Sequence, residues 1–133
     1  MHLFVIVAPN RPGSLAAILA AIAEHGVSVT TGGGATAGDV GAIALQFDDD
    51  DRARAALESA GASFHEVPTV AAWLEPDPGT LADAARRLGE AGVNIEALAP
   101  VELGGGRIGV LFGVDNPDLA TIALGGDVVP LPD

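Results

Sequence analysis

Hydrophobic positions fall at helical spacing in two places along this chain, and the two places lie 66 residues apart. After Gly13 and again after Gly79, apolar residues occupy positions i, i+3, i+4 and i+7. The first set is Leu15, Ile18, Leu19 and Ile22, and the second is Leu81, Ala84, Ala85 and Leu88. This spacing predicts two amphipathic helices that each turn one apolar stripe inward.

The ends of both predicted helices carry the residues that helix ends favour. Gly26 and Gly92 follow the last periodic positions, where we expect them to form left-handed caps. At the other end, Ser14 or Thr80 can satisfy the first free N–H groups, and Thr80 with Asp83 has the spacing of a capping box. Local sequence therefore predicts where each helix begins and ends.

Extended, β-rich runs surround each predicted helix. One run precedes each helix, at 3–7 and 70–74, and two follow it, at 27–31 and 40–47 in the first half and at 93–103 and 107–114 in the second. The glycine triplets at 32–34 and 104–106 separate these pairs and are interpreted as flexible hairpin connections. A second helix comes next in each half, at 49–60 and 116–124, and a closing strand is predicted at 64–67 and 128–131.

The order of elements in each half is β-α-β-β-α-β. This order predicts an α+β protein of two ferredoxin-like βαββαβ modules, each a four-stranded antiparallel sheet with two helices on one face. The predicted modules are residues 1–67 and 68–133. Because a module of about 60 residues is marginally stable by itself, we expect the halves to pack on each other or on a second chain.

Composition narrows the function. The 133 residues carry a net charge of −12, which repels nucleic acid and anionic membrane surfaces. Cysteine, lysine and tyrosine are absent, which removes thiol and lysine nucleophiles and thiolate metal sites. The longest apolar stretch, 15–23, is shorter than the roughly 18 residues of a membrane span, and no basic leader precedes it. We expect a cytoplasmic protein without a cofactor.

The segments "NRPGSLAAILAAIAEHGVSV" and "PDPGTLADAARRLGEAGVNI" resemble two copies of the ACT domain, a small regulatory module that senses amino acids in metabolic enzymes. The resemblance covers nearly the whole chain. It implies a regulatory protein, and not an enzyme, that binds an amino acid or related metabolite between paired modules. It also implies a homodimer and a partner enzyme that the protein regulates.

A Pro-Gly turn before a helix suits a ligand carboxylate for physical reasons as well. Glycine lets the backbone approach a ligand closely, and the free N–H groups at the helix start attract an anion. The resemblance adds an amide from the turn, Asn10, and one from the second strand, Asn94. The candidate ligand-binding residues are Asn10, Arg11, Pro12, Gly13, Ser14, Ser28, Asp77, Gly79, Thr80 and Asn94.

The chain departs from the pattern of serine-sensing members of the family. Ala8 stands where they carry a histidine, Ser28 replaces a strand asparagine, and Leu74 and Pro76 replace the polar pair of the second half. The two halves are therefore unequal. A composite site, with Asn10 meeting Asn94 across a module interface, is one hypothesis.

Other features have simpler interpretations. The run Asp48 to Asp51 is assigned to helix capping, not to a metal, because it lacks the spacing of a calcium loop. The three histidines are scattered, and the lone Trp73 is expected in a core. Two further functions stay open: a ligand-free protein–protein interaction subunit, and a small enzyme on the same scaffold.

Overall fold

The computed structural model describes residues 1–131, and the chain divides into two compact units, Met1–Glu66 and Val67–Asp133. The hydrogen-bonded strand order is β2-β3-β1-β4-β6-β5, and β4 contributes residues to both units. Residues 132–133 of the predicted second module lie outside the described part. The elements are β1 (His2–Pro9), α1 (Ser14–Glu24), β2 (Val29–Ala37), β3 (Val40–Phe47), α2 (Asp50–Ser59), β4 (Ser63–Ala72), α3 (Thr80–Glu90), β5 (Ile95–Gly104), β6 (Arg107–Val114), α4 (Pro117–Leu124) and the 3₁₀ helix η1 (Gly125–Asp127).

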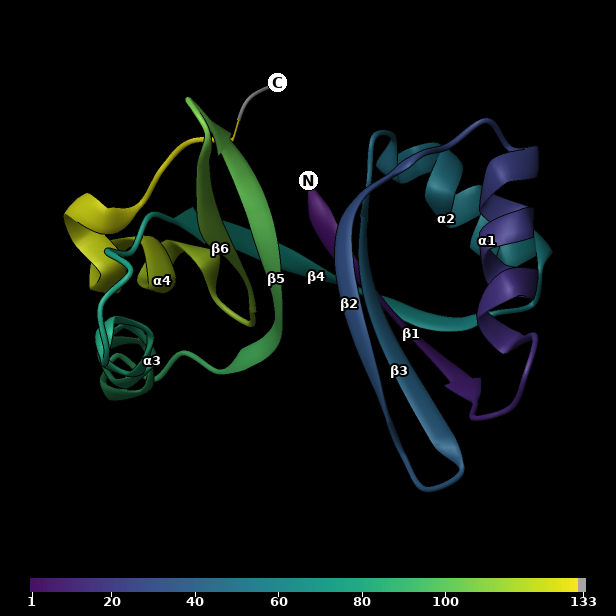
Figure 1. The fold of residues 1–133 in the computed structure, drawn as a ribbon, viewed down its shortest axis with the longest axis horizontal. Coiled ribbons are helices and arrows are strands. Elements are labelled where there is room, and N and C mark those ends of the chain that lie inside the picture. Colours follow the sequence, from purple (N-terminus) through teal and green to yellow (C-terminus); the bar gives the residue numbers. More distant parts are fainter. Residues whose placement is uncertain (132–133) are drawn as a thin grey trace. The chain divides into compact units, whose positions relative to one another are not determined.

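In the first unit, β3 pairs antiparallel with β1 on one side and with β2 on the other. Helices α1 and α2 cover one face of these strands (Figure 1). The core between the layers is built around Phe4 and Phe47, whose rings meet edge to face at 5.2 Å, together with Ile22 and Leu57. Helix α1 therefore reaches the core through its later residues.

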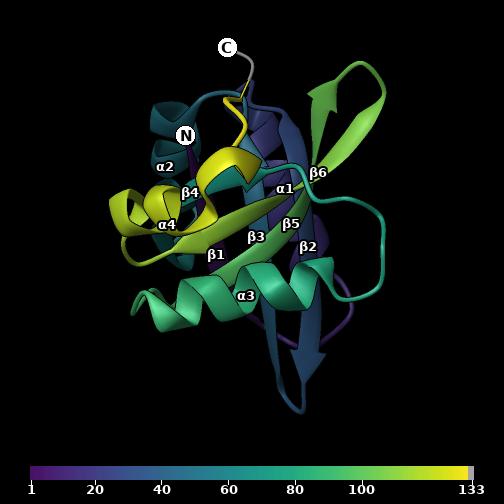
Figure 2. The same ribbon diagram turned by 90° about the vertical axis from the view of Figure 1, so that its left-hand side faces the viewer.

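In the second unit, β6 pairs antiparallel with β4 and with β5. Helices α3 and α4 lie together on one face of β5 and β6 (Figure 2). Phe112, Leu88 and Leu124 are fully buried between these layers. The predicted α+β class and the pair of helices on one face are thus present in both units.

The fourth strand of the second half differs from the prediction. Instead of a strand at 128–131, η1 follows α4, and Val128 forms an isolated antiparallel bridge with Ala72. Val129 N–H still donates to Ala71 O at 2.9 Å, but Pro130 has no N–H with which to extend a ladder. The predicted four-stranded sheet is therefore reduced here to three strands and one bridge within the described residues.

The predicted strands at 64–67 and 70–74 form one continuous strand, β4, instead of two. Pro68 lies inside this strand. Proline holds φ near the value of extended chain, so it interrupts one backbone donor without turning the chain. The sequence break at Val67 and Pro68 is therefore a boundary between units and not between strands.

The first glycine triplet was also misplaced by the sequence pattern. Gly32, Gly33 and Gly34 lie inside β2, and the hairpin turn falls at Gly38, where φ is +59°. A Cβ at Gly32 would lie 2.5 Å from Leu45 Cδ2 and 2.7 Å from Ala44 O. Glycine is needed here for close strand approach. In the second triplet, Gly105 and Gly106 do form the β5–β6 turn, and Gly104 is the last residue of β5.

Helix ends match the predictions in part. Gly26 and Gly92 have φ of +70° and +78°, which confirms the left-handed caps. Asp49 caps α2 by accepting a hydrogen bond from the Arg52 N–H at 3.0 Å, which confirms the capping role of the acidic run.

No helix within residues 1–131 is long and apolar enough to cross a membrane.

Candidate functional site

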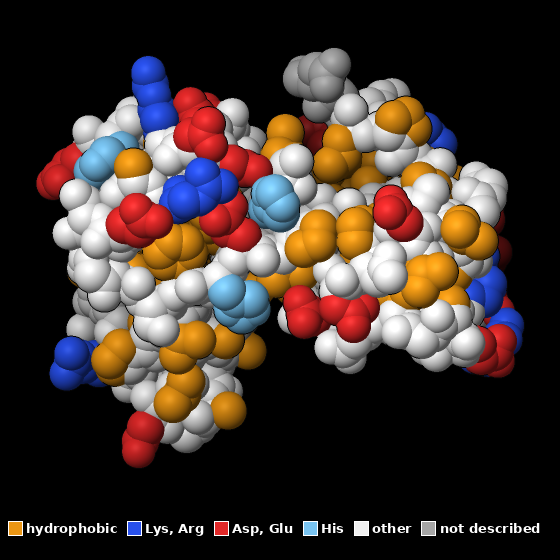
Figure 3. All heavy atoms as spheres, turned by 180° about the vertical axis from the view of Figure 1, so that it is seen from behind, with side chains coloured by type: hydrophobic (Ala, Val, Ile, Leu, Met, Phe, Trp, Pro, Cys, Tyr) orange, Lys and Arg blue, Asp and Glu red, His pale blue; other side chains and the backbone are white. Residues whose placement is uncertain are grey.

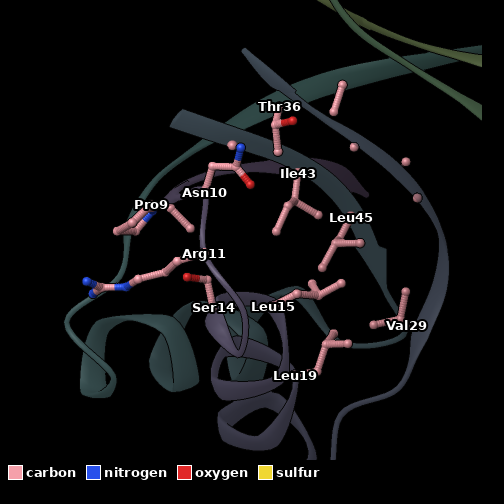
Figure 4. Close-up of a pocket in the computed structure, with 16 residues that line it drawn as sticks. Pro9, Asn10, Arg11, Ser14, Leu15, Leu19, Val29, Thr36, Ile43 and Leu45 are labelled. Carbon is pink, nitrogen blue, oxygen red and sulfur yellow. The ribbon is translucent and has the colours of Figure 1, made fainter. Parts of the chain in front are cut away.

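The first Pro-Gly turn is anchored by Asn10. Its Nδ2 donates to Gly38 O at 2.9 Å, and its backbone N–H donates to Asp39 O at 2.8 Å. These two bonds tie the β1–α1 turn to the tip of the β2–β3 hairpin. The remaining polar atom, Asn10 Oδ1, has no partner among residues 1–131 and points toward the groove beside Ile43 (Figure 4).

Helix α1 begins directly after this turn without a side-chain cap. Gly13 is the N-cap residue, with φ of +90°, and no side chain accepts from the first N–H groups. The Ser14 hydroxyl also has no hydrogen-bond partner in the described part of the chain, so its predicted capping role is wrong. Because the cap residue has no side chain, the positive end of this helix is left open to an anion.

A groove of about 560 Å³ opens between α1, β2 and β3 (Figure 4). Leu15 and Leu19 line it and are 47% and 36% exposed, so the prediction that both turn into the core is wrong. Only Ile18 and Ile22 of that stripe pack against the core. The sixteen lining residues are Ala8, Pro9, Asn10, Arg11, Ser14, Leu15, Leu19, Val29, Gly32, Gly33, Gly34, Ala35, Thr36, Gly41, Ile43 and Leu45.

The second Pro-Gly turn has the same backbone but different bonds. Gly79 is again an uncapped N-cap residue with φ of +90°. The Thr80 hydroxyl donates backward to Glu75 O at 2.8 Å and to Asp77 O at 3.2 Å. Thr80 therefore closes its own turn, and the predicted capping box with Asp83 does not form.

Ionic side chains line the pocket of about 400 Å³ beside this second turn. Arg87 Nη2 lies 2.7 Å from Asp127 Oδ2, and its Nε lies 3.0 Å from Asp83 Oδ2 without the alignment of a hydrogen bond. A hydrogen bond from the Arg86 guanidinium holds the pKa of Asp83 below its usual range. The pocket is lined by Trp73, Leu74, Glu75, Pro78, Gly79, Thr80, Asp83, Arg87 and Asp127.

Trp73 is a wall of this second pocket and is only partly buried, which corrects the expectation of a core position. The guanidinium of Arg107 lies over its ring, 5.2 Å from the centroid. An exposed arginine can shield an indole face from water in this way while keeping its own charge solvated.

The strand candidates Ser28 and Asn94 lie away from the turns. Ser28 N–H donates to Asp48 Oδ1 at 3.0 Å, and Asn94 N–H donates to Asp115 Oδ1 at 2.9 Å. Both follow the C-terminal ends of α1 and α3, which as eleven-residue helices are about 16 Å long. Neither residue lines its unit's pocket, and Pro12, Gly13 and Asp77 are likewise absent from the linings.

Sequence reasoning found the turn but missed most of the groove. Its walls come from Val29, Ile43 and Leu45 on the strands and from the glycines of β2. Glycines inside an otherwise extended run are a signal of close backbone approach and could have placed the triplet in a strand. Within residues 1–131 no group of three or more His, Asp or Glu side chains is placed to hold a metal ion.

Both units are α+β, and each carries a pocket beside its Pro-Gly turn. Residues 2–60 match the family model of the ACT domain. No curated protein matches the chain at a significant level.

Solved structures share the fold over almost the whole chain. A protein from Bacteroides thetaiotaomicron, 22% identical, superposes with a TM-score of 0.72 over 92% of this chain and 85% of its own. The ligand-free regulatory subunit of aspartate kinase from Thermus thermophilus, 23% identical, superposes with a TM-score of 0.61 over 92% of this chain and 87% of its own. The aspartate kinase regulatory subunit from Thermus flavus, 21% identical, superposes with a TM-score of 0.64 over 92% of this chain and 88% of its own. At these identities the likeness establishes the fold.

Proposed function

We propose that this protein is a regulatory subunit that binds an amino acid or a closely related carboxylate metabolite in the groove of its first unit. The observation that carries the proposal is the 560 Å³ groove, which has the size of a small-molecule site and ends at the uncapped start of α1. The ACT domain over residues 2–60 supports a regulatory role.

The groove offers complementary groups for the two ends of an amino acid. The open N-terminus of α1 and the free Ser14 hydroxyl can donate hydrogen bonds to a carboxylate. Asn10 Oδ1 is an unused acceptor that points inward, as an ammonium group requires (Figure 4). The Arg11 side chain points away from the groove in Figure 4, so it would contribute only a distant positive charge unless it turned inward.

We extend the proposal to regulation through module pairing. A ligand does work on a partner enzyme only through its differential affinity for two arrangements of the protein. Pairing of modules, within one chain or in a homodimer, supplies two such arrangements, and Asn94 of a paired module is the candidate that completes the Asn10 site. The second half, predicted as an ACT-like module at 68–133, would act mainly as the pairing partner.

The test is a thermal-shift screen of the full chain against the common amino acids and their 2-oxo acids. A ligand at about 100 times its Kd raises stability by roughly 2.7 kcal/mol, which is a shift of several degrees. Asn10→Ala and Ser14→Ala should reduce the shift, and Thr80→Ala, which matches Ser14 in the second turn, should leave it unchanged. If the ligand affinity is unchanged by both Asn10→Ala and Asn94→Ala, the hypothesis of a composite site formed by these two residues is wrong.

A second candidate, the ligand-free interaction subunit, is favoured by one observation. Helix α1 has no charged residue before Glu24, and Leu15, Ala16 and Ala20 are exposed on it. An uncharged helix in a chain of net charge −12 suits a protein contact. This function becomes the better account if no amino acid or 2-oxo acid in the screen raises the Tm.

A further inference from the structure

The groove of the first unit is polar at one end and aliphatic at the other. Asn10 and Thr36 lie at the end nearest the turn, while Leu19 and Val29 lie at the opposite end (Figure 4). None of the sixteen lining residues is acidic, and Arg11 is the one charged residue among them. The part of a ligand that extends away from the turn would therefore meet hydrocarbon.

At the aliphatic end of the groove, the buried side chains of Leu45 and Ile43 make binding of a polar ligand group unfavourable. Leu45 is 7% exposed and packs with the core cluster, and Ile43 is partly buried against the same cluster. A hydroxyl or carboxylate placed against these side chains would lose water without gaining a hydrogen bond. An alkyl chain in the same place gains free energy from each methylene removed from water.

The glycines of β2 leave bare backbone along one wall of the groove. Gly32 and Gly34 oppose Leu45 and Ile43 across the strand pair, so this stretch of the wall carries no side chains. In the second unit the matching strand positions carry Leu98 and Pro100, opposite Phe112 and Val110. The first unit is thus the one in which bare backbone faces aliphatic side chains of β3.

We propose that the ligand of the first unit carries an unbranched or branched aliphatic side chain of about three to four carbons on its amino-acid or 2-oxo-acid head. This inference rests on the proposed function, because it assigns the head group to the turn. The ligand's aliphatic side chain lies toward Leu19 and Val29, and the affinity grows with the length of that side chain until the groove is filled. Serine, aspartate and other small polar amino acids are excluded as preferred ligands.

The experiment is a calorimetric titration of the full chain with L-alanine, L-2-aminobutyrate, L-norvaline and L-norleucine. Burial of about 0.8 kcal/mol per methylene corresponds to a Kd that falls about fourfold at each step. L-Serine and L-aspartate should bind more weakly than L-2-aminobutyrate. Equal affinity for L-alanine and L-norleucine would overturn this inference and leave the proposed function standing, whereas no binding by any amino or 2-oxo acid would overturn both.

A matched pair of variants assigns the effect to this groove. Leu15→Ser changes a lining residue that is 47% exposed, and Leu81→Ser changes its counterpart on α3, which is 45% exposed and lines neither pocket. Only Leu15→Ser should weaken the dependence of Kd on the length of the ligand's side chain. If Leu15→Ser instead lowers the mass measured by sedimentation equilibrium and leaves every Kd unchanged, the groove is an interface between copies and the inference is wrong.

Discussion

The two Pro-Gly turns have nearly the same backbone and different side-chain chemistry. Gly13 and Gly79 share a φ of +90°, and both precede uncapped helices. In the second turn, however, Thr80 uses its hydroxyl within the turn, and Arg87 joins two carboxylates beside the pocket. In the first unit the position matching Arg87 is Ala21, and the groove is aliphatic.

The comparison teaches that a repeated backbone is not a repeated site. Backbone geometry at both turns follows from glycine and from the helix that each turn begins. The proposed ligand selectivity follows from the strand residues that face the helix, and these differ between the halves. Acidic side chains and apolar side chains both reach the surface of the protein in Figure 3, so surface charge alone does not identify the candidate groove.

The largest expected effect comes from adding a side chain where β2 packs closely against β3 in the first unit. Gly32→Val places side-chain atoms against Ala44 O and Leu45, and we expect a loss of about 1–3 kcal/mol in the free energy of unfolding. Gly33→Ala is the control, because a Cβ there meets nothing within 4 Å. Urea denaturation measures both, and equal stability of the two variants would contradict the close approach of β2 to β3.

The next effect is expected from removing the arginine that distinguishes the second unit. Arg87→Ala breaks the ion pair with Asp127 and the hydrogen bond to Leu124 O, for a loss of about 1–2 kcal/mol, reduced by the partial exposure of these groups. Arg86→Ala removes a more exposed arginine with partners one turn away and should change the Tm little. A loss from Arg86→Ala that matches the loss from Arg87→Ala would contradict this assignment.

The smallest effect concerns an ion pair of the first unit, between Arg54 and Glu66. Arg54 Nε donates to Glu66 Oε2 at 2.7 Å, and this bond holds the pKa of Glu66 below its usual 4.5, against an opposing effect of burial. Because the folded pKa is the lower one, the unfolded chain binds more protons between the two values. The stabilisation is therefore complete above about pH 4.5 and is lost as the pH falls through the folded pKa.

Glu66→Gln should remove this contribution. The difference in Tm between the native chain and Glu66→Gln is expected to be largest near pH 6 and to shrink as the pH falls below 4.5. A difference that stays constant from pH 6 to pH 3 would show that Glu66 acts by packing instead of by charge.

The sequence by itself determined the four helices, most of the strands and their repetition, but not the missing strand at 128–131 or the single strand β4. Helical spacing and the caps at Gly26 and Gly92 are local properties, and they placed α1 and α3 correctly. Asp49 was recognised as a cap because an acid at a helix start has a local partner. Of the turn residues of the candidate groove, Ser14 was found from its place at the start of a helix, and Asn10 was implied by the family resemblance.

Only the tertiary structure decided which side chains line the groove and which strand residues lie opposite one another. That Leu15 and Leu19 line a groove instead of the core depends on where the strands leave α1 uncovered. Gly32 became a strand residue because Ala44 and Leu45 approach it from a neighbouring strand, which no local pattern encodes. Strand register joins residues far apart in sequence, so the aliphatic lining of the groove is set by long-range packing, whereas its polar end is set by a short, local turn.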